Sequence, residues 1–417
     1  MDDGSYWKSE AGLRQKDLRR FVSALRLGII KEPRSKSAKG KAASRELREL
    51  LLEGAATWHR LDGDYGARWP RPRADLALDI AFRTTNPNSP RIDKLCKYLL
   101  DELGGMKGPP IVYNDDRQVK MLFAHRHTAD DQPLISVTAQ TVAQVRAGIC
   151  RMHDFGTRWG VEYANWELDR HGDLDIDDDY EPGWWSAITT DPDTIAEFTL
   201  RDEVRQRMRY QMTNLAATDQ FSSQVVLAYA VEQRRDRWAW QTTGDALHTL
   251  LDYGLAVGLG PLPQAAGQSA NFVESTTSAL ADLVARRRWM TPLLPSVGLT
   301  LFYLETDTGK DLDNLFLDVL PIVLNVLRPP AVALAEFSPI DALRAWRDAD
   351  QQGVLTAATE IAFIEAVALK GVTSDRLRPG SVILALSHGS RWESWWDSTL
   401  RFVEEHNDST SPDDEFF

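Results

Sequence analysis

The spacing of apolar residues along the first third of the chain alternates between helix and strand periods. Residues 44–61 carry apolar side chains at helical spacing, and residues 74–85 form the dense apolar run of a strand. Residues 91–103 return to helical spacing, and "QVKMLFAHRH" and "PLISVTAQTV" then show strand patterns. The pattern predicts the order helix, strand, helix, strand, strand.

The second half of the chain repeats this pattern after a shift of 220 residues without a gap. Arg68-Trp69 falls on Arg288-Trp289, and Pro109-Pro110 falls on Pro329-Pro330. The apolar stretch "NLFLDVLPIVLNVL" lies opposite the helix 91–103, and "TEIAFIEAVAL" and "GSVILALSHG" supply two further strands. Shared tryptophan and Pro-Pro positions are rare coincidences, so we predict an internal duplication.

The remaining segments complete a predicted α+β fold. The N-terminal "RQKDLRRFVSALRLGII" has helical spacing, and residues 141–270 are mainly helical in pattern. We therefore predict two related α/β units, each a small mixed sheet with helices, joined by a helical region. The predicted parts are a basic helical N-terminal segment (1–50), a first α/β unit (51–140), a helical connection (141–270), a second α/β unit (271–392) and an acidic C-terminal tail (393–417).

Composition and charge narrow the class of protein. The chain has 417 residues, two cysteines and a formal net charge of −13. The cysteines fit neither a disulfide framework nor a cysteine-based zinc site, and the polar N-terminus shows no signal peptide, so we expect a cytoplasmic protein. The run Leu315–Val326 is too short to span a membrane and is predicted to be a buried helix. The acidic charge argues against nonspecific coating of nucleic acid and makes a protein partner plausible, although the N-terminal segment is basic.

Two carboxylates precede the helix of the second copy. Asp311 and Asp313 are two residues apart, and in an extended backbone their side chains point the same way. Converging carboxylates repel each other, so such a pair favours a bound cation, and hard oxygen ligands suit Mg²⁺ or Mn²⁺. The competing interpretation is that Asp313 caps the helix.

The first copy offers acidic residues in related positions. Asp93 lies opposite Asp313, and Asp115 and Asp116 stand in "YNDDRQV". By itself the Asn-Asp-Asp stretch is typical of a turn, and Lys97, one helical turn after Asp93, is typical of a solvated helix face.

These residues carry a resemblance to a known family. "RIDKLCKYLLDEL" followed by "VYNDDRQV" resembles the RusA family of Holliday-junction resolvases, which has a DxDN motif, a lysine four residues after its second Asp, and a DDxQV motif. In the second copy "KDLDNLFLDVL" is similar to the same DxDN motif. The resemblance covers roughly residues 75–140 and 285–390.

The resemblance implies a function and a set of roles. RusA-like proteins are small α/β homodimers of DNA recombination and repair that bind four-way junctions and cut phosphodiesters with Mg²⁺ or Mn²⁺. A tandem chain would mimic that dimer, and it could dimerise further. The carried-over residues are Asp93, Lys97, Asp115 and Asp116 in the first copy, and Asp311, Asp313 and Asn314 in the second.

Both copies depart from the family pattern. Arg91 replaces the first Asp of the motif in the first copy, and Leu317 replaces the lysine in the second. The DD turn is missing from the second copy, where the gapless shift places Glu336 opposite Asp116 and the strand order offers Glu360 instead. We prefer Glu336 because the Pro-Pro pair precedes it at a matching distance.

Three hypotheses follow for the site. The second copy alone cuts, both copies contribute to a composite site, or neither cuts and the protein is a scaffold that binds nucleic acid or protein. The leading hypothesis is a magnesium-dependent endonuclease acting on branched or junction DNA. Its predicted catalytic and metal-binding residues are Asp93, Lys97, Asp115, Asp116, Asp311, Asp313 and Glu336.

Overall fold

The computed structural model describes most of the chain. The described residues are 24–35, 40–61, 69–71, 73–86, 89–129, 131–159, 192–231, 242–262, 270–306, 311–331, 359–372 and 374–399, with residue 12 and positions 343, 344, 346–348 and 351.

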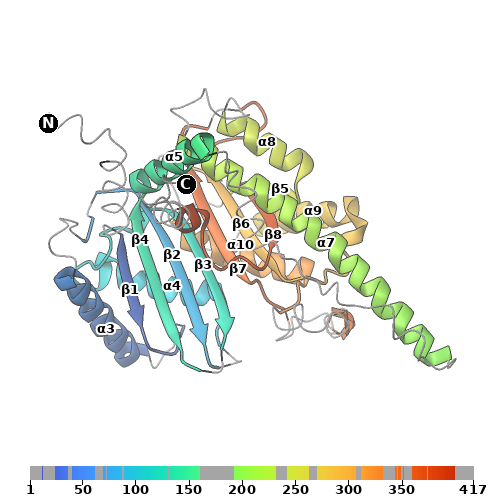
Figure 1. Cartoon of the computed structure of the whole chain (residues 1–417), viewed down its shortest axis with the longest axis horizontal. Coiled ribbons are helices and arrows are strands. Elements are labelled where there is room, and N and C mark those ends of the chain that lie inside the picture. Colours follow the sequence, from blue (N-terminus) through green and yellow to red (C-terminus); the bar gives the residue numbers. More distant parts are fainter. Residues whose placement is uncertain are drawn as a thin grey trace, which may run out of the picture.

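Eight strands form one mixed sheet that runs through the molecule (Figure 1). Their spatial order is β1-β4-β2-β3-β7-β6-β8-β5. In chain order the strands are β1 (Leu25–Ile29), β2 (Leu76–Thr84), β3 (Val119–Thr128), β4 (Leu134–Thr141), β5 (Ala256–Pro261), β6 (Val297–Leu304), β7 (Phe363–Leu369) and β8 (Ser381–His388).

The two halves of the sheet have the same connectivity. From one edge inward the order is β1, β4, β2, β3, and from the other edge it is β5, β8, β6, β7. In each half the last pair is parallel and the other pairs are antiparallel. The halves meet where β3 pairs antiparallel with β7, so the sheet is continuous across the centre.

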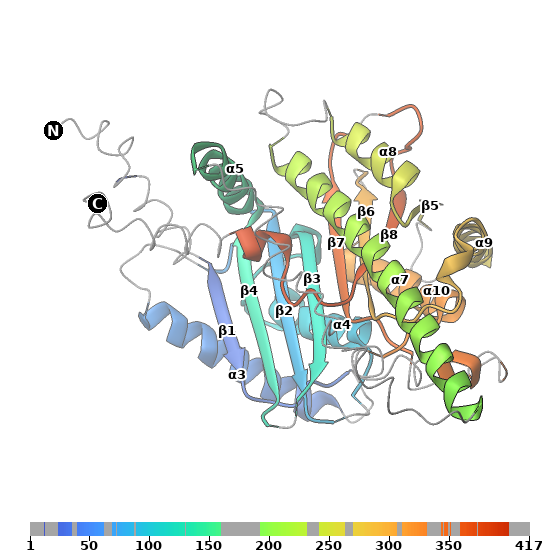
Figure 2. The ribbon, with the colours of Figure 1, turned by 45° about the vertical axis from the view of Figure 1, so that its right-hand side comes forward.

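Helices cover both faces of this sheet (Figures 1 and 2). One core lies beneath α3 (Gly40–Leu61), α4 (Ile92–Leu103), α9 (Ala270–Arg286) and α10 (Leu312–Leu327). The other core lies beneath α5 (Val142–Trp159), α7 (Pro192–Val231) and α8 (Thr243–Tyr253). Short 3-10 helices complete the fold: η1 (Gly105–Lys107), η2 (Asp116–Gln118) and η5 (Arg288–Met290).

The sequence explains why the central strands stay inside. Every residue of β6 and of β7 is buried, as expected for strands that are covered by helices on both faces. The run Leu315–Val326 falls within α10, most of whose residues are buried, which confirms the predicted buried helix.

The predicted mixed α/β character is confirmed, but two strands were missed. β1 lies in the N-terminal segment that was predicted to be helical, and β5 lies in the region 141–270 that was predicted to be mainly helical. Both are short edge strands. In β1 buried and exposed residues alternate strictly, which is the strand period, but five residues are too few to outweigh the helical pattern around them.

The start of the predicted acidic tail belongs to the core. Trp395 and Trp396 are buried, and the backbone N–H of Ser394 donates to Asp79 Oδ2 at 2.7 Å. The apolar burial of the two tryptophans therefore outweighs the acidic composition of this segment as far as residue 399. The acidic residues 404–417 lie outside the described part of the chain.

Among the residues that the structure describes, no helix combines the length and apolarity that crossing a lipid bilayer requires.

Candidate metal centre

Three carboxylates from different elements converge beside the centre of the sheet. Each of Asp101, Asp116 and Asp313 offers one oxygen, and these oxygens all lie within 4.8 Å of one another. Asp101 is near the end of α4, Asp116 begins η2, and Asp313 is in the first turn of α10. The cluster forms because α4 packs against α10, and it therefore draws on both halves of the chain.

The helical repeat of α4 places a lysine next to the cluster. Residues 93, 97 and 101 are spaced by four and share one helix face. Lys97 Nζ donates to Asp313 Oδ2 at 2.8 Å and lies 3.4 Å from Asp101 Oδ1. Lys97 therefore bridges a carboxylate of the first half and one of the second half.

A capped turn holds Asp116 in place. Asp115 Oδ1 accepts the N–H of Arg117 at 2.9 Å. Asp115 and Gln118 also form a capping box, in which the Asp115 side chain accepts the backbone N–H of Gln118 and the Gln118 side chain accepts the N–H of Asp115 at 3.1 Å. With both of these groups satisfied locally, Asp116 is the acid of this turn that reaches the cluster.

The absence of a side chain at Gly104 lets this turn approach α4. A Cβ at Gly104 would lie 2.9 Å from the Tyr113 ring and 3.2 Å from Asp116 Oδ1. The Tyr113 hydroxyl donates to the carbonyl of Leu100 at 2.8 Å, which fixes the ring against the helix. The glycine after α4 thus sets the distance between Asp116 and the other two acids.

The N-terminus of α10 presents the acids of the second half. Asp311 is the N-cap residue with extended backbone, but its side chain does not cap the helix and instead accepts from Asn314 Nδ2 at 3.3 Å. Asp313 is almost fully buried and accepts the N–H of Asn314 at 2.7 Å. The positive end of the helix dipole favours negative charge at this position.

Burial and neighbouring charges shift the pKa values of Asp116, Asp311 and Lys97. Burial, followed by the charge of Asp313, raises the pKa of Asp116 to about 6, and Lys97 only partly offsets this. Burial and the charge of Asp313 also raise the pKa of Asp311. Burial alone would lower the pKa of Lys97, but its hydrogen bond to Asp313 and the charges of Asp313 and Asp101 raise it. The cluster is therefore short of positive charge.

The donor set fits a hard divalent cation. All donors are carboxylate oxygens, which Mg²⁺ and Mn²⁺ prefer. Opposite ligands of an octahedral Mg²⁺ lie roughly 4 Å apart and adjacent ones lie closer, and the three oxygens all lie within 4.8 Å of one another. Asp101, Asp116 and Asp313 could hold such an ion, with Asp311 beside them and Lys97 at the edge of the site.

Other predicted residues are engaged elsewhere. Asp93 has a fully buried side chain and binds Arg91, whose Nη2 and Nε lie 2.9 and 3.3 Å from its two oxygens. Asp115 caps its own turn. Asp93 and Asp115 are therefore not among the three carboxylates that converge.

Of the two alternatives for a third acid in the second copy, Glu360 and Glu336, the described part of the chain includes Glu360. Glu360 accepts from Arg126 Nε at 2.9 Å, and Arg126 also donates to the carbonyls of Ser89 and Pro90. This contact ties the start of β7 to the loop before α4. Glu336 lies outside the described residues.

Asp101 is the residue that the sequence reasoning missed. Its signal is the spacing of four residues after Lys97 and eight after Asp93, which puts all three on one helix face. Asp101 lies between the DxDN-like stretch with its lysine and the DDxQV-like stretch, so neither motif includes it.

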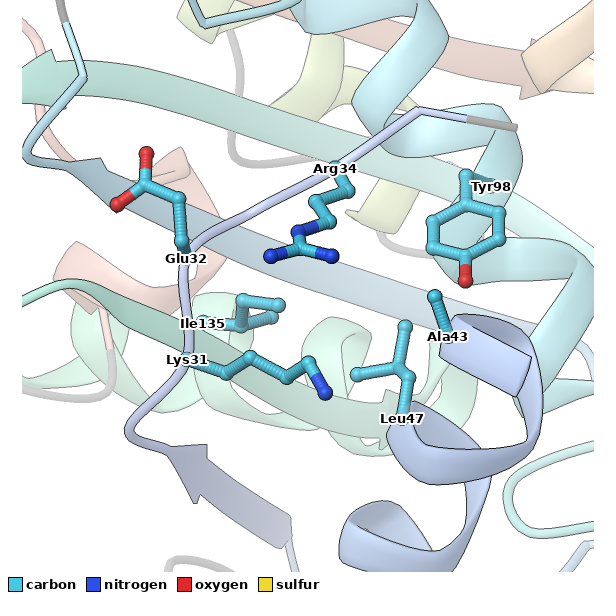
Figure 3. A pocket seen from close by; sticks show the side chains of 7 residues that line it. All are labelled: Lys31, Glu32, Arg34, Ala43, Leu47, Tyr98 and Ile135. Atoms are coloured by element: carbon cyan, nitrogen blue, oxygen red, sulfur yellow. The ribbon is translucent and has the colours of Figure 1, made fainter. Parts of the chain in front are cut away.

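Two hollows lie elsewhere on the described surface. One, with a volume of about 10 Å³, has room for roughly one water and opens beneath α3 (Figure 3), where it is lined by Lys31, Glu32, Arg34, Ala43, Leu47, Tyr98 and Ile135. The other, of about 360 Å³, includes Val326 and Leu327 at the far end of α10. At 1.5 Å per residue this end is about 20 Å from Asp313, so neither hollow belongs to the acidic cluster.

Searches of protein-family models, of curated proteins and of solved structures found no significant match to this chain.

Proposed function

We propose that the chain is a Mg²⁺- or Mn²⁺-dependent endonuclease that hydrolyses DNA phosphodiesters, with a site similar to that of RusA-like resolvases. The observation that carries the proposal is the convergence of Asp101, Asp116 and Asp313 on one spot, with Lys97 at its edge. The sequence resemblance extends the proposal to branched DNA such as four-way junctions.

We also propose that the chain consists of two fused RusA-like units. The support is the repeated strand order of the two half-sheets, together with the 220-residue register that places α10 opposite α4. In this interpretation the β3–β7 pairing stands where two subunits of a dimer would meet. The triad is then shared between the units, which is the composite site among the three hypotheses.

The residues can be assigned roles in hydrolysis. A divalent ion would lower the pKa of a water molecule and stabilise charge on the phosphate. Asp101, Asp116 and Asp313 hold that ion, and Lys97 offsets negative charge as it develops on the phosphate. Asp311, half-buried with a raised pKa, is placed to accept the proton from the attacking water.

The bond changes balance with water as the only co-reactant. The water oxygen forms a bond to phosphorus, and the bond from phosphorus to one sugar oxygen breaks. One proton passes to the carboxylate, and the leaving oxygen takes a proton from solvent. Arg117, an exposed residue of η2 that is close enough for its charge to act on Asp311, is placed to contact a neighbouring phosphate.

The direct test is cleavage of labelled DNA. Wild-type protein with Mg²⁺ is expected to cut a four-way junction, and Asp313→Asn and Asp101→Asn are expected to abolish cutting. Asp252→Asn is the matched control, because Asp252 is an exposed acid of α8 that binds Arg376 and lies outside the cluster. Cutting that persists in the Asp101 or Asp313 variant would contradict the proposal.

A second function is favoured by one specific observation. Lys97 already bonds to Asp313 and lies near Asp101, so it neutralises part of the cluster without any metal. A scaffold that binds DNA or a protein partner without cutting requires only that the charges of the cluster are partly balanced, and Lys97 does this. Retained DNA binding without Mn²⁺ binding, measured by titration, would favour the scaffold.

A further inference from the structure

The N-termini of α4 and α10 are built alike. Arg91 (φ −58°, ψ 151°) and Asp311 (φ −68°, ψ 141°) are the N-cap residues of the two helices, and neither side chain caps its helix. The shift of 220 residues pairs these two residues. Four pairs of residues in this register have matching burial. The acids Asp93 and Asp313 are both buried, and both members of the other three pairs are half-buried, namely Arg91/Asp311, Lys97/Leu317 and Asp101/Pro321.

This correspondence defines a second position that is equivalent to the triad. At the triad, the start of α10 supplies Asp313, and α4 supplies Lys97 and Asp101. In the 220-residue register, the counterpart of Asp313 is Asp93 at the start of α4, and the side chains paired with Lys97 and Asp101 are on α10. Those side chains are Leu317 and Pro321, which have neither charge nor a ligand oxygen.

Arg91 closes the equivalent position to cations. Its guanidinium binds both oxygens of Asp93, at 2.9 and 3.3 Å, in the two-point geometry typical of strong Arg–carboxylate pairs. That pair occupies the oxygen lone pairs that a metal would use, and its positive charge repels a divalent ion. Asp313, by contrast, faces two other carboxylates and only one lysine.

We propose that only the position around Asp313 holds a divalent cation, and that one bound chain therefore cuts a single strand and leaves a nick. The proposal rests on the proposed nuclease function and deepens it. Each event adds one water across one phosphorus–oxygen bond and leaves one phosphate end and one hydroxyl end. A symmetric pair of sites would cut two strands in one encounter.

Cation binding tests the asymmetry without any cleavage. Mn²⁺ binding to the purified full chain is measured by electron paramagnetic resonance and by equilibrium dialysis. The wild type is expected to bind with high affinity, and Asp313→Asn is expected to lose all of that binding. If Asp313→Asn keeps half of it, the equivalent position is occupied and the inference is overturned. If the wild type binds no Mn²⁺, both the nuclease proposal and this inference are overturned.

A restored variant tests which residues cause the asymmetry. Arg91→Asp and Pro321→Asp place carboxylates at the counterparts of Asp311 and Asp101, and Leu317→Lys restores the counterpart of Lys97. The triple variant is expected to bind twice as much Mn²⁺ as the wild type. A triple variant that is folded by circular dichroism but shows no added binding would overturn the assignment, and if it does not fold, the Asp313→Asn result decides.

The strand count is then measured on a supercoiled plasmid that carries an extruded cruciform. At limiting protein the wild type is expected to convert the plasmid to relaxed circles, and the triple variant is expected to yield linear molecules. Linear product formed directly by the wild type, without a relaxed intermediate, would overturn the single-cut inference and leave the nuclease proposal standing.

Discussion

At the residue scale, the protonation of Asp116 is linked to the stability of the fold. Its pKa in the folded chain is about 6, above the ordinary value of 3.8, because burial and Asp313 disfavour the charged form. A carboxyl with a raised folded pKa contributes most to stability below pH 4, and it loses that contribution as pH rises through about 6.

Asp116→Asn should therefore stabilise the metal-free protein at pH 8 and leave it unchanged near pH 4. Allowing for solvent screening, we expect about 1 kcal/mol, or a rise in Tm of about 1 °C for a chain of 417 residues. Thermal melts in EDTA at the two pH values measure this. An equal gain at both pH values would show that repulsion among the carboxylates is not the cause.

A variant of Lys97 would separate the proposed metal binding from the proposed catalysis. Its ammonium group competes with a divalent ion for Asp313, since it donates to that carboxylate at 2.8 Å. Lys97→Gln should therefore raise Mn²⁺ affinity and lower the cleavage rate at saturating metal by about 100-fold. Mn²⁺ titration and single-turnover cleavage measure the two effects. A loss of Mn²⁺ affinity together with a loss of cleavage rate would instead indicate that Lys97 only supports the structure of the site.

At the scale of elements, the approach of η2 to α4 depends on Gly104. Gly104→Ala introduces a Cβ 2.9 Å from the Tyr113 ring and 3.2 Å from Asp116 Oδ1, which displaces the turn. Support residues of metal sites typically change affinity by about 10–100-fold, and we expect a loss of about tenfold in Mn²⁺ affinity.

Gly148→Ala is the matched control for that variant. A Cβ at Gly148 meets nothing within 4 Å, and the residue lies inside α5. Replacing an interior helical glycine by alanine stabilises a helix by up to about 1 kcal/mol, so Mn²⁺ affinity should stay unchanged. Equal loss of affinity in both variants would mean that the packing of η2 does not set the geometry of the triad.

The elements that the sequence predicted are those with dense apolar runs. The central strands β6 and β7 are buried throughout and α10 is mostly buried, so their apolar pattern is strong over many residues. β1 and β5 are edge strands whose pairing with β4 and β8 is a tertiary event, and their own short patterns are ambiguous. Sequence periodicity therefore identified the interior of the sheet but missed both of its edges.

The residues of the candidate site also differ in how far the sequence alone could identify them. Asp116 and Asp313 stand in recognisable motifs, whereas Asp101 joins them only because α4 packs against α10. Asp93 also stands in a motif, but Arg91 two residues earlier binds it. Local sequence identified the candidate acids, and only the packing of the two helices separates those that converge from those that are neutralised.

At the scale of the whole molecule, the continuous sheet determines where a complete site can form. β3 and β7 pair within one chain, and this brings Asp101 and Asp116 of the first half to Asp313 of the second. A site that is complete within one chain cannot be restored by a second chain. A domain-swapped dimer, in which α4 of one copy packs against α10 of another, would behave differently.

Mixing two inactive variants distinguishes these arrangements. Asp101→Asn and Asp313→Asn each remove a ligand from different halves, so a swapped dimer of the two would contain one intact triad and one doubly defective triad. We expect the variants, mixed or unfolded and refolded together, to bind no more Mn²⁺ than either alone, because each chain closes its own sheet at β3–β7. Wild-type protein taken through the same refolding is the control for recovery. Recovery of Mn²⁺ binding in the mixture, absent from the separate variants, would place the triad between chains and make the dimer the unit of function.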